Sequence, residues 1–134
     1  MQATLQWRGD MLFEGTTESG QKLLLDGDKK QAATPMEAVL IAAGSCSSVD
    51  VISILQKARQ DITDVQVDLS GNRADAVPAV FTDIHLHFKV TGKTVAEKHV
   101  KRAVELSADK YCSVAIMLSG SVNVTHSFEV IEGE

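Results

Sequence analysis

Two cysteines, Cys46 and Cys112, are the side chains best suited to covalent chemistry in this sequence. A thiolate is a strong nucleophile, and its oxidation to a sulfenic acid allows condensation with a second thiol to form a disulfide. Two cysteines that meet in the fold can therefore carry out redox chemistry. The competing interpretation is a pair of inert core thiols, because free cysteine is among the most frequently buried residue types.

The predicted surroundings of the two thiols differ. Cys112 stands at the start of a short predicted helix, 112–118, where unpaired N–H groups and the helix dipole favour the thiolate. Cys46 lies in the middle of a long apolar helix, where burial raises the pKa of a thiol, and Asp50 one turn later raises it further. A reactive Cys46 therefore requires a nearby cation.

The region before the long helix contains one arginine, Arg8, close to a predicted turn between two strands. A guanidinium offers a planar fork of donors to an anion, which makes Arg8 the first choice for the cation that activates Cys46. The alternatives are Lys22, Lys29 and Lys30. The competing interpretation of Arg8 is a solvent-exposed turn residue, which is the common setting for arginine.

The first half of the chain predicts three short strands and one long helix. The strands are expected at 5–7, 11–13 and 22–26, separated by turn residues. The helix begins at Thr34 and Pro35, where Thr34 and Glu37 form a capping box, and it continues to about residue 59 or 60. Gly44 weakens this helix, which indicates a packing reason for the glycine.

The second half predicts strands at 63–70, 81–90 and 121–131, a helix opened by a second capping box at Thr94 to Glu97, and the short helix 112–118. Apolar and polar residues alternate in 81–90, as expected for an antiparallel sheet with one covered face. Strands in two groups, without regular alternation of strand and helix, predict an α+β fold.

Apolar residues occupy most of the circumference of the long helix between Val39 and Leu55. This is far wider than the stripe of roughly 100° that one sheet covers. The other side is expected to meet a second copy of the chain, which predicts an obligate homodimer.

Composition restricts the classes of function. The chain has 134 residues, and we expect a single domain, 1–134. With 13 basic and 18 acidic side chains, its net charge of −5 is unfavourable for nucleic acid or an anionic membrane. No secretory signal is visible at the N-terminus, so a cytoplasmic, reducing location is expected. Because Glu37, Asp50 and several serines interrupt the long helix, a core helix is favoured over a membrane span.

Histidines offer a weaker candidate site. His85 and His87 point the same way from one predicted strand, but no further ligand with suitable spacing lies nearby, and a solvated strand face is favoured over a metal site. His99 and His126 are expected to be surface or structural residues. The sequence contains no phosphate loop or dinucleotide fingerprint.

The segments TPMEAVLIAAGSC, ending at Cys46, and KYCSVA, containing Cys112, resemble the two cysteine motifs of the OsmC/Ohr family of osmotically inducible and organic hydroperoxide resistance proteins. The similarity spans nearly the whole domain, and the residues around both cysteines are most similar to the YhfA-like branch. The resemblance implies an intertwined α+β homodimer, with antiparallel sheets packed around long central helices and active sites at the subunit interface.

The resemblance also implies a thiol-dependent peroxidase of the oxidative stress response. In that role Cys46 is the peroxidatic residue that reduces an organic hydroperoxide, Cys112 resolves its sulfenic acid to a disulfide, and a dithiol then reduces the enzyme without metal or cofactor. Family members use an N-terminal arginine to hold the first cysteine as thiolate and a glutamate near the helix start to orient that arginine. Arg8 and Glu37 are the candidates for these roles.

The sequence departs from the peroxidase pattern at two positions. Met36 follows Pro35 where a glutamate is usual, and Ser113 follows Cys112 where a proline is common. Together with Asp50, these departures support an alternative of a different class. In that alternative the chain keeps the family fold but binds a small apolar ligand or senses redox state, with weak or no catalysis.

Overall fold

The structure is a computed structural model that describes residues 1–133. The chain divides into two compact units, Met1–Val39 and Leu40–Glu134. In the first unit, strands β1 (Ala3–Trp7), β2 (Leu12–Thr17) and β3 (Lys22–Asp26) form an antiparallel sheet in the order β1-β2-β3. The three predicted strands are confirmed, and β2 continues beyond its predicted end.

Helix α1 (Pro35–Lys57) begins at the predicted capping box. The Thr34 N–H donates to Glu37 Oε1 at 3.0 Å, and the Glu37 N–H donates to Thr34 Oγ1 at 3.1 Å. The helix ends slightly earlier than predicted, and Arg59 just after it has a left-handed backbone with φ of 58°. The division between the two units falls inside this helix.

The second unit contains a three-stranded sheet of β4 (Asp61–Arg73), β5 (Phe81–Lys93) and β6 (Asn123–Glu132), in the order β4-β5-β6. The buried face of β5 is the predicted one and carries Ile84, Leu86, Phe88 and Val90. The expectation of a purely antiparallel sheet is wrong, because β6 runs parallel to β5. Three helical segments carry the chain back across the sheet before β6 begins, as a parallel pairing requires.

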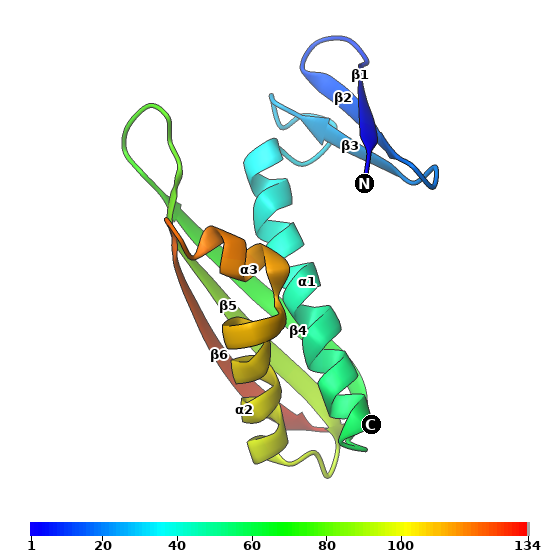
Figure 1. Cartoon of the computed structure of the whole chain (residues 1–134), viewed down its shortest axis with the longest axis vertical. Coiled ribbons are helices and arrows are strands. Elements are labelled where there is room, and N and C mark those ends of the chain that lie inside the picture. Colours follow the sequence, from blue (N-terminus) through cyan, green and yellow to red (C-terminus); the bar gives the residue numbers. More distant parts are fainter. Residues whose placement is uncertain (134) are drawn as a thin grey trace. The chain divides into compact units, whose positions relative to one another are not determined.

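Those segments are α2 (Glu97–Leu106), the π-helical turn η1 (Ser107–Tyr111) and α3 (Ser113–Leu118). Figure 1 shows α1 and α2 lying over the same sheet. The predicted capping box at Thr94 is wrong, because α2 is preceded by Ala96, which makes no side-chain cap. Thr94 adopts a left-handed turn with φ of 54°, and its N–H bonds to the carboxylate of Glu132 instead.

Gly44 allows α1 to approach β4 closely, which confirms the predicted packing reason. A Cβ at this position would lie 2.8 Å from a methyl carbon of Leu69. The buried side of α1 is a single narrow stripe: Ala43, Gly44, Ser47, Val51 and Leu55. By length and composition α1 would also suffice to cross a membrane, a criterion that the core helix of a soluble protein meets equally well.

Candidate functional site

Cys112 is positioned by two irregular features of the backbone. The π-helical turn η1 closes with a bond from the Cys112 N–H to the Ser107 carbonyl oxygen at 2.9 Å. Cys112 then caps α3, and its Sγ accepts a hydrogen bond from the Ala115 N–H at 3.4 Å. The side chain is fully buried, with Sγ 4.0 Å from the carbonyl oxygen of Ala43 on α1. The predicted location of Cys112 at a helix N-terminus is thus confirmed.

The fold brings Cys46 and Cys112 together, with Cys46 half-buried and Cys112 inside the core. Burial, the neighbouring Cys46 thiol and the Asp50 carboxylate raise the pKa of Cys112 from 9.0 to about 11. The hydrogen bond from Ala115 lowers this pKa but is outweighed by burial. The prediction that the helix N-terminus lowers the pKa of Cys112 is therefore wrong. Burial raises this pKa by more than the hydrogen bond at the N-terminus lowers it.

A buried polar network joins α1 to the helical segment before Cys112. The hydroxyl oxygens of Ser47 and Ser107 are 2.8 Å apart, and both side chains are fully buried. The Ser107 hydroxyl also lies 3.2 Å from Oδ2 of Asp50, to which it can donate. No sequence-based expectation included this network. The sequence did contain one indication of the network, which is Ser107. A serine on the apolar stripe of a helix is expected to be buried, and a buried hydroxyl requires a hydrogen-bond partner.

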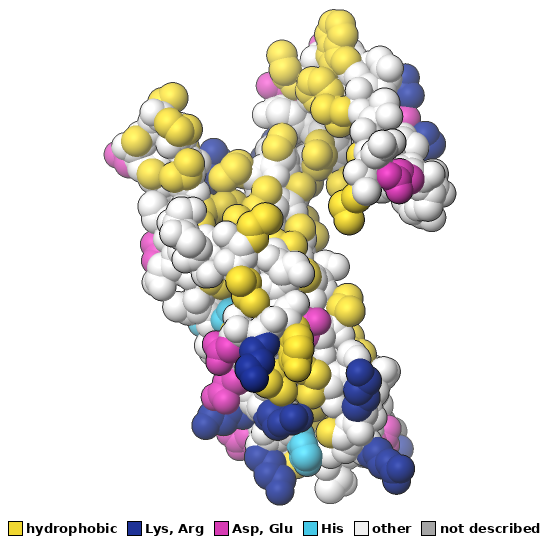
Figure 2. All heavy atoms as spheres, in the orientation of Figure 1, with side chains coloured by type: hydrophobic (Ala, Val, Ile, Leu, Met, Phe, Trp, Pro, Cys, Tyr) yellow, Lys and Arg dark blue, Asp and Glu magenta, His cyan; other side chains and the backbone are white. Residues whose placement is uncertain are grey.

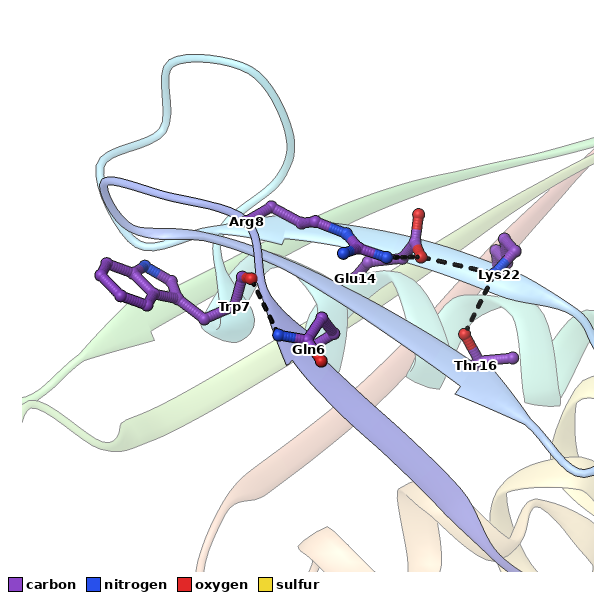
Figure 3. Close-up of polar contacts among 6 residues, drawn as sticks. All are labelled: Gln6, Trp7, Arg8, Glu14, Thr16 and Lys22. Atoms are coloured by element: carbon purple, nitrogen blue, oxygen red, sulfur yellow. Dashed lines mark hydrogen bonds and ion pairs between the residues drawn. The ribbon is translucent and has the colours of Figure 1, made fainter.

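Arg8 belongs to a surface cluster on the first unit (Figure 3). Its Nη2 is 2.8 Å from Oε1 of Glu14, and Lys22 Nζ is 3.3 Å from the same oxygen. Lys22 also reaches the Thr16 hydroxyl at 3.4 Å. The Arg8 guanidinium and, to a smaller extent, the Lys22 ammonium lower the pKa of Glu14. The side chain of Arg8 is half-exposed, so it remains open to further contacts.

Glu37, the candidate for orienting Arg8, contacts Thr34 and Lys29 in this chain. Its two carboxylate oxygens bind the Thr34 N–H and Lys29 Nζ, the latter at 3.3 Å. The backbone bond from Thr34 and the Lys29 ammonium lower the pKa of Glu37. The carboxylate that contacts Arg8 in this chain is that of Glu14, and the contacts of Glu37 are those of a cap of α1.

The histidine pair on β5 binds across the sheet to β6. His85 Nδ1 lies 2.6 Å from the Thr125 hydroxyl, and one nitrogen of each imidazole lies within 2.7 Å of the Ser127 hydroxyl. Over residues 1–133, no group of three or more metal-ligating side chains is assembled. His126 stacks on Phe88, and burial lowers its pKa, in line with a structural role.

Residues 27–127 match the family described as OsmC-like protein. Protein YhfA of Escherichia coli strain K12 is 52% identical over 132 residues, which cover 98% of each chain. A crystal structure of a hypothetical protein from Aquifex aeolicus VF5 is 34% identical, with a TM-score of 0.90 over 99% of this chain and 97% of that one.

A more distant structure, the organic hydroperoxide resistance protein OhrB of Bacillus subtilis, has a TM-score of 0.63 at 14% identity, covering 96% of this chain and 98% of that one. At that identity it supports the fold alone. The family match covers most of the chain and the identity to YhfA extends over nearly all of it, so this chain belongs to the OsmC-like family.

Proposed function

We propose that this protein is a thiol-dependent peroxidase that reduces organic hydroperoxides, with Cys46 as the peroxidatic residue and Cys112 as the resolving residue. The observation that carries the proposal is the pairing of a half-buried thiol with a buried one, contributed by α1 and by the start of α3. The more accessible thiol can meet a peroxide, and the buried thiol stands next to it.

The proposed reaction balances with these two thiols and an external dithiol. The Cys46 thiolate attacks the outer peroxide oxygen, the O–O bond breaks, and the alkoxide leaves as an alcohol after taking up a proton. The resulting Cys46 sulfenic acid condenses with the Cys112 thiol, which releases water and forms a disulfide. A dithiol reduces that disulfide. Neither a metal nor a bound cofactor takes part.

Turnover in the presence of dithiothreitol and cumene hydroperoxide tests the proposal directly. Cys46→Ser is expected to reduce the rate to that of dithiothreitol alone. Cys112→Ser is expected to allow one oxidation of Cys46, with its sulfenic acid captured by dimedone and detected by mass spectrometry. If the wild type and Cys46→Ser consume the hydroperoxide equally slowly, the peroxidase proposal fails.

The cation that activates Cys46 is part of the proposal, and Arg8 is our candidate. Arg8 is already oriented by Glu14 and retains an exposed guanidinium. Iodoacetamide labelling of Cys46 against pH, in a Cys112→Ser background, compares Arg8→Met with Lys29→Met, which removes one of the alternative cations. An upward shift of about one pH unit with Arg8→Met alone supports the assignment. An unchanged curve rejects Arg8.

A binding or sensing role is the second candidate function. It is favoured by the absence of a glutamate directly after Pro35 and by the Asp50 carboxylate, which raises the pKa of Cys112. In that case native mass spectrometry should detect a retained apolar ligand, and the Cys46 thiol should titrate near the ordinary value of about 8.5. A strongly lowered pKa of Cys46 would argue against this candidate.

We also propose that the protein acts as a cytoplasmic homodimer, formed through the exposed apolar side of α1. Ile41 and Val49 on that side are 56% and 66% exposed. A shallow groove of about 460 Å³ beside Val49 includes Ile52. These exposed apolar side chains on the central helix, set among serines, suit contact with a second copy of the same helix.

Val49→Asp is expected to weaken the dimer and to lower the unfolding temperature at a given protein concentration, because an obligate dimer often has no stable folded monomer. Leu55→Asp is expected to unfold the chain, since Leu55 is fully buried. A wild-type protein that sediments as a monomer at micromolar concentration would contradict the dimer.

A further inference from the structure

The face of the second sheet that is turned away from α1 and α2 carries a chain of polar side chains. It runs from Thr125 through His85, Ser127 and His87 to Glu129, with each neighbour within 3.8 Å. The two histidines stand two positions apart on β5, so both point to the side opposite the core. Both are half-buried, and the side chain of His87 is 30% exposed, so a dissolved ion can reach the pair.

One nitrogen of each imidazole points at the same place. His85 Nε2 lies 2.7 Å and His87 Nδ1 lies 2.6 Å from the hydroxyl oxygen of Ser127. That hydroxyl has a single proton, so it can donate to only one of the two rings. A divalent metal ion, in contrast, accepts a lone pair from each of two imidazoles, at about 2.0–2.1 Å in the case of zinc. The convergence of the two nitrogens on one point thus suits a metal ion.

The other nitrogen of each ring has its own polar partner. His85 Nδ1 lies 2.6 Å from the hydroxyl of Thr125, and His87 Nε2 lies 3.8 Å from Oε1 of Glu129. Metal-binding histidines usually have such a partner on the nitrogen that faces away from the metal, because it holds the ring in place and fixes the tautomer. The two partners come from β6, whose place beside β5 is a result of the tertiary structure.

The charges around the histidine pair also favour a cation. Asp68 lies directly across from His87 in the sheet, and Glu129 adds a second carboxylate. The neighbouring lysine on β5, Lys89, is neutralised by Asp68, with its Nζ 2.9 Å from Oδ2. Figure 2 shows the helical side of the molecule, where Lys and Arg side chains gather around the lower parts of α1 and α2. Those cations lie across the sheet from the histidines.

We propose that His85 and His87 together bind a divalent transition-metal ion, with Cu²⁺ preferred over Ni²⁺ and Zn²⁺. The ligands are His85 Nε2 and His87 Nδ1, and water completes the coordination. Imidazole suits all three metals, and a given set of nitrogen ligands binds Cu²⁺ most tightly. Among the residues that the structure describes, no third histidine, cysteine or carboxylate completes a metal-binding group, so the ion is exchangeable. The site is independent of the proposed peroxidase function.

Separate titrations of the full-length protein with Cu²⁺, Ni²⁺ and Zn²⁺ test the site. The Cys46→Ser variant is used, since it lacks the more accessible thiol, which could itself bind or reduce Cu²⁺. Calorimetry measures the affinities, and broadening of backbone amide signals by Cu²⁺ locates the ion. Cu²⁺ is expected to bind most tightly and to broaden first the signals of β5 and β6 around the histidine pair.

Single histidine variants identify the ligands. His85→Gln and His87→Gln should each weaken Cu²⁺ binding by about tenfold or more, because loss of an outer partner alone typically costs at least that much. The matched control is His99→Gln, which removes a histidine from α2 and should leave the affinity unchanged. Matching amide spectra of the variants without metal verify that all of them are folded.

Three results would overturn the inference. Equal weakening by His99→Gln and His87→Gln would indicate only scattered binding to surface histidines. An unchanged affinity in either His85→Gln or His87→Gln would show that the two rings do not share one ion. Broadening confined to segments other than β5 and β6 would place the metal elsewhere.

Discussion

The pKa values of Cys112, in the second unit, and Glu14, in the first, are shifted in opposite directions. In the second unit, burial raises the pKa of Cys112 to about 11, and the nearby Asp50 carboxylate adds to the effect. In the first unit, the Arg8 and Lys22 cations lower the pKa of Glu14. Each group thus keeps the form that its surroundings stabilise, a neutral thiol in one case and a carboxylate in the other.

The difference bears on the roles proposed for the two thiols. A resolving thiol does not need to be a thiolate before the peroxide arrives, so a buried Cys112 suits that role. A peroxidatic thiol needs a cation, and the part of the second unit nearest the thiols supplies the Asp50 carboxylate instead. Arg8 therefore remains the proposed cation, and the Arg8→Met labelling experiment tests it.

The largest expected difference is in stability, between the buried Ser47–Ser107–Asp50 network of the second unit and the exposed Glu14 cluster of the first. Ser107→Ala removes a buried hydroxyl shared by Ser47 and Asp50, and should lower the free energy of unfolding by about 2 kcal/mol. Thr16→Ala removes a hydroxyl from the exposed Glu14 cluster and should change it by less than about 0.5 kcal/mol. Urea denaturation under reducing conditions measures both values. Equal effects would mean that the buried network adds no stability.

The raised pKa of Cys112 predicts a loss of stability in alkali. Folding retains the thiol proton, so this contribution is complete below the unfolded pKa near 9 and is lost as the pH rises toward about 11. Unfolding free energies of Cys46→Ser should therefore decrease over this range more steeply than those of Cys46→Ser with Cys112→Ala. Parallel curves for the two variants would show that burial does not hold the Cys112 proton.

A smaller change should follow from Asp50→Asn. The Asp50 carboxylate is a minor cause of the raised Cys112 pKa, so its removal should move that pKa downward by less than burial has moved it upward. The Cβ chemical shift of Cys112 against pH, in a Cys46→Ser background, measures the shift without requiring access of a reagent to the buried thiol. Ser53→Ala, on the same helix, is the control. An upward shift with Asp50→Asn would contradict the electrostatic explanation.

The smallest expected effect concerns the exposed cluster. Arg8→Met should raise the pKa of Glu14 toward its ordinary value, and Lys22→Met should raise it less, because the Arg8 contact is the larger cause. Carboxyl-carbon chemical shifts of Glu14 against pH measure both changes, and added salt should diminish them. The order would be reversed if the Lys22 ammonium were the main partner of Glu14.

Local features of the fold could be predicted because neighbouring residues determine them. The capping box at Thr34 and Glu37 involves residues three positions apart, and the position of Cys112 before α3 follows from one short segment. The alternation along β5 also identified its buried face before any partner strand was known. The same kind of reasoning failed at Thr94, where contact with Glu132 from a distant strand replaced the predicted cap.

What the sequence by itself determined is therefore the α+β class, the main elements and the two cysteine motifs of the family. Only the tertiary structure decided that β6 runs parallel to β5, that Ser47 meets Ser107, and that Glu14 is the partner of Arg8. The pKa of Cys112 was likewise decided by the tertiary structure. Its helix N-terminus can be read from local sequence, but its pKa depends on burial by residues distant in the chain, and burial is the stronger effect.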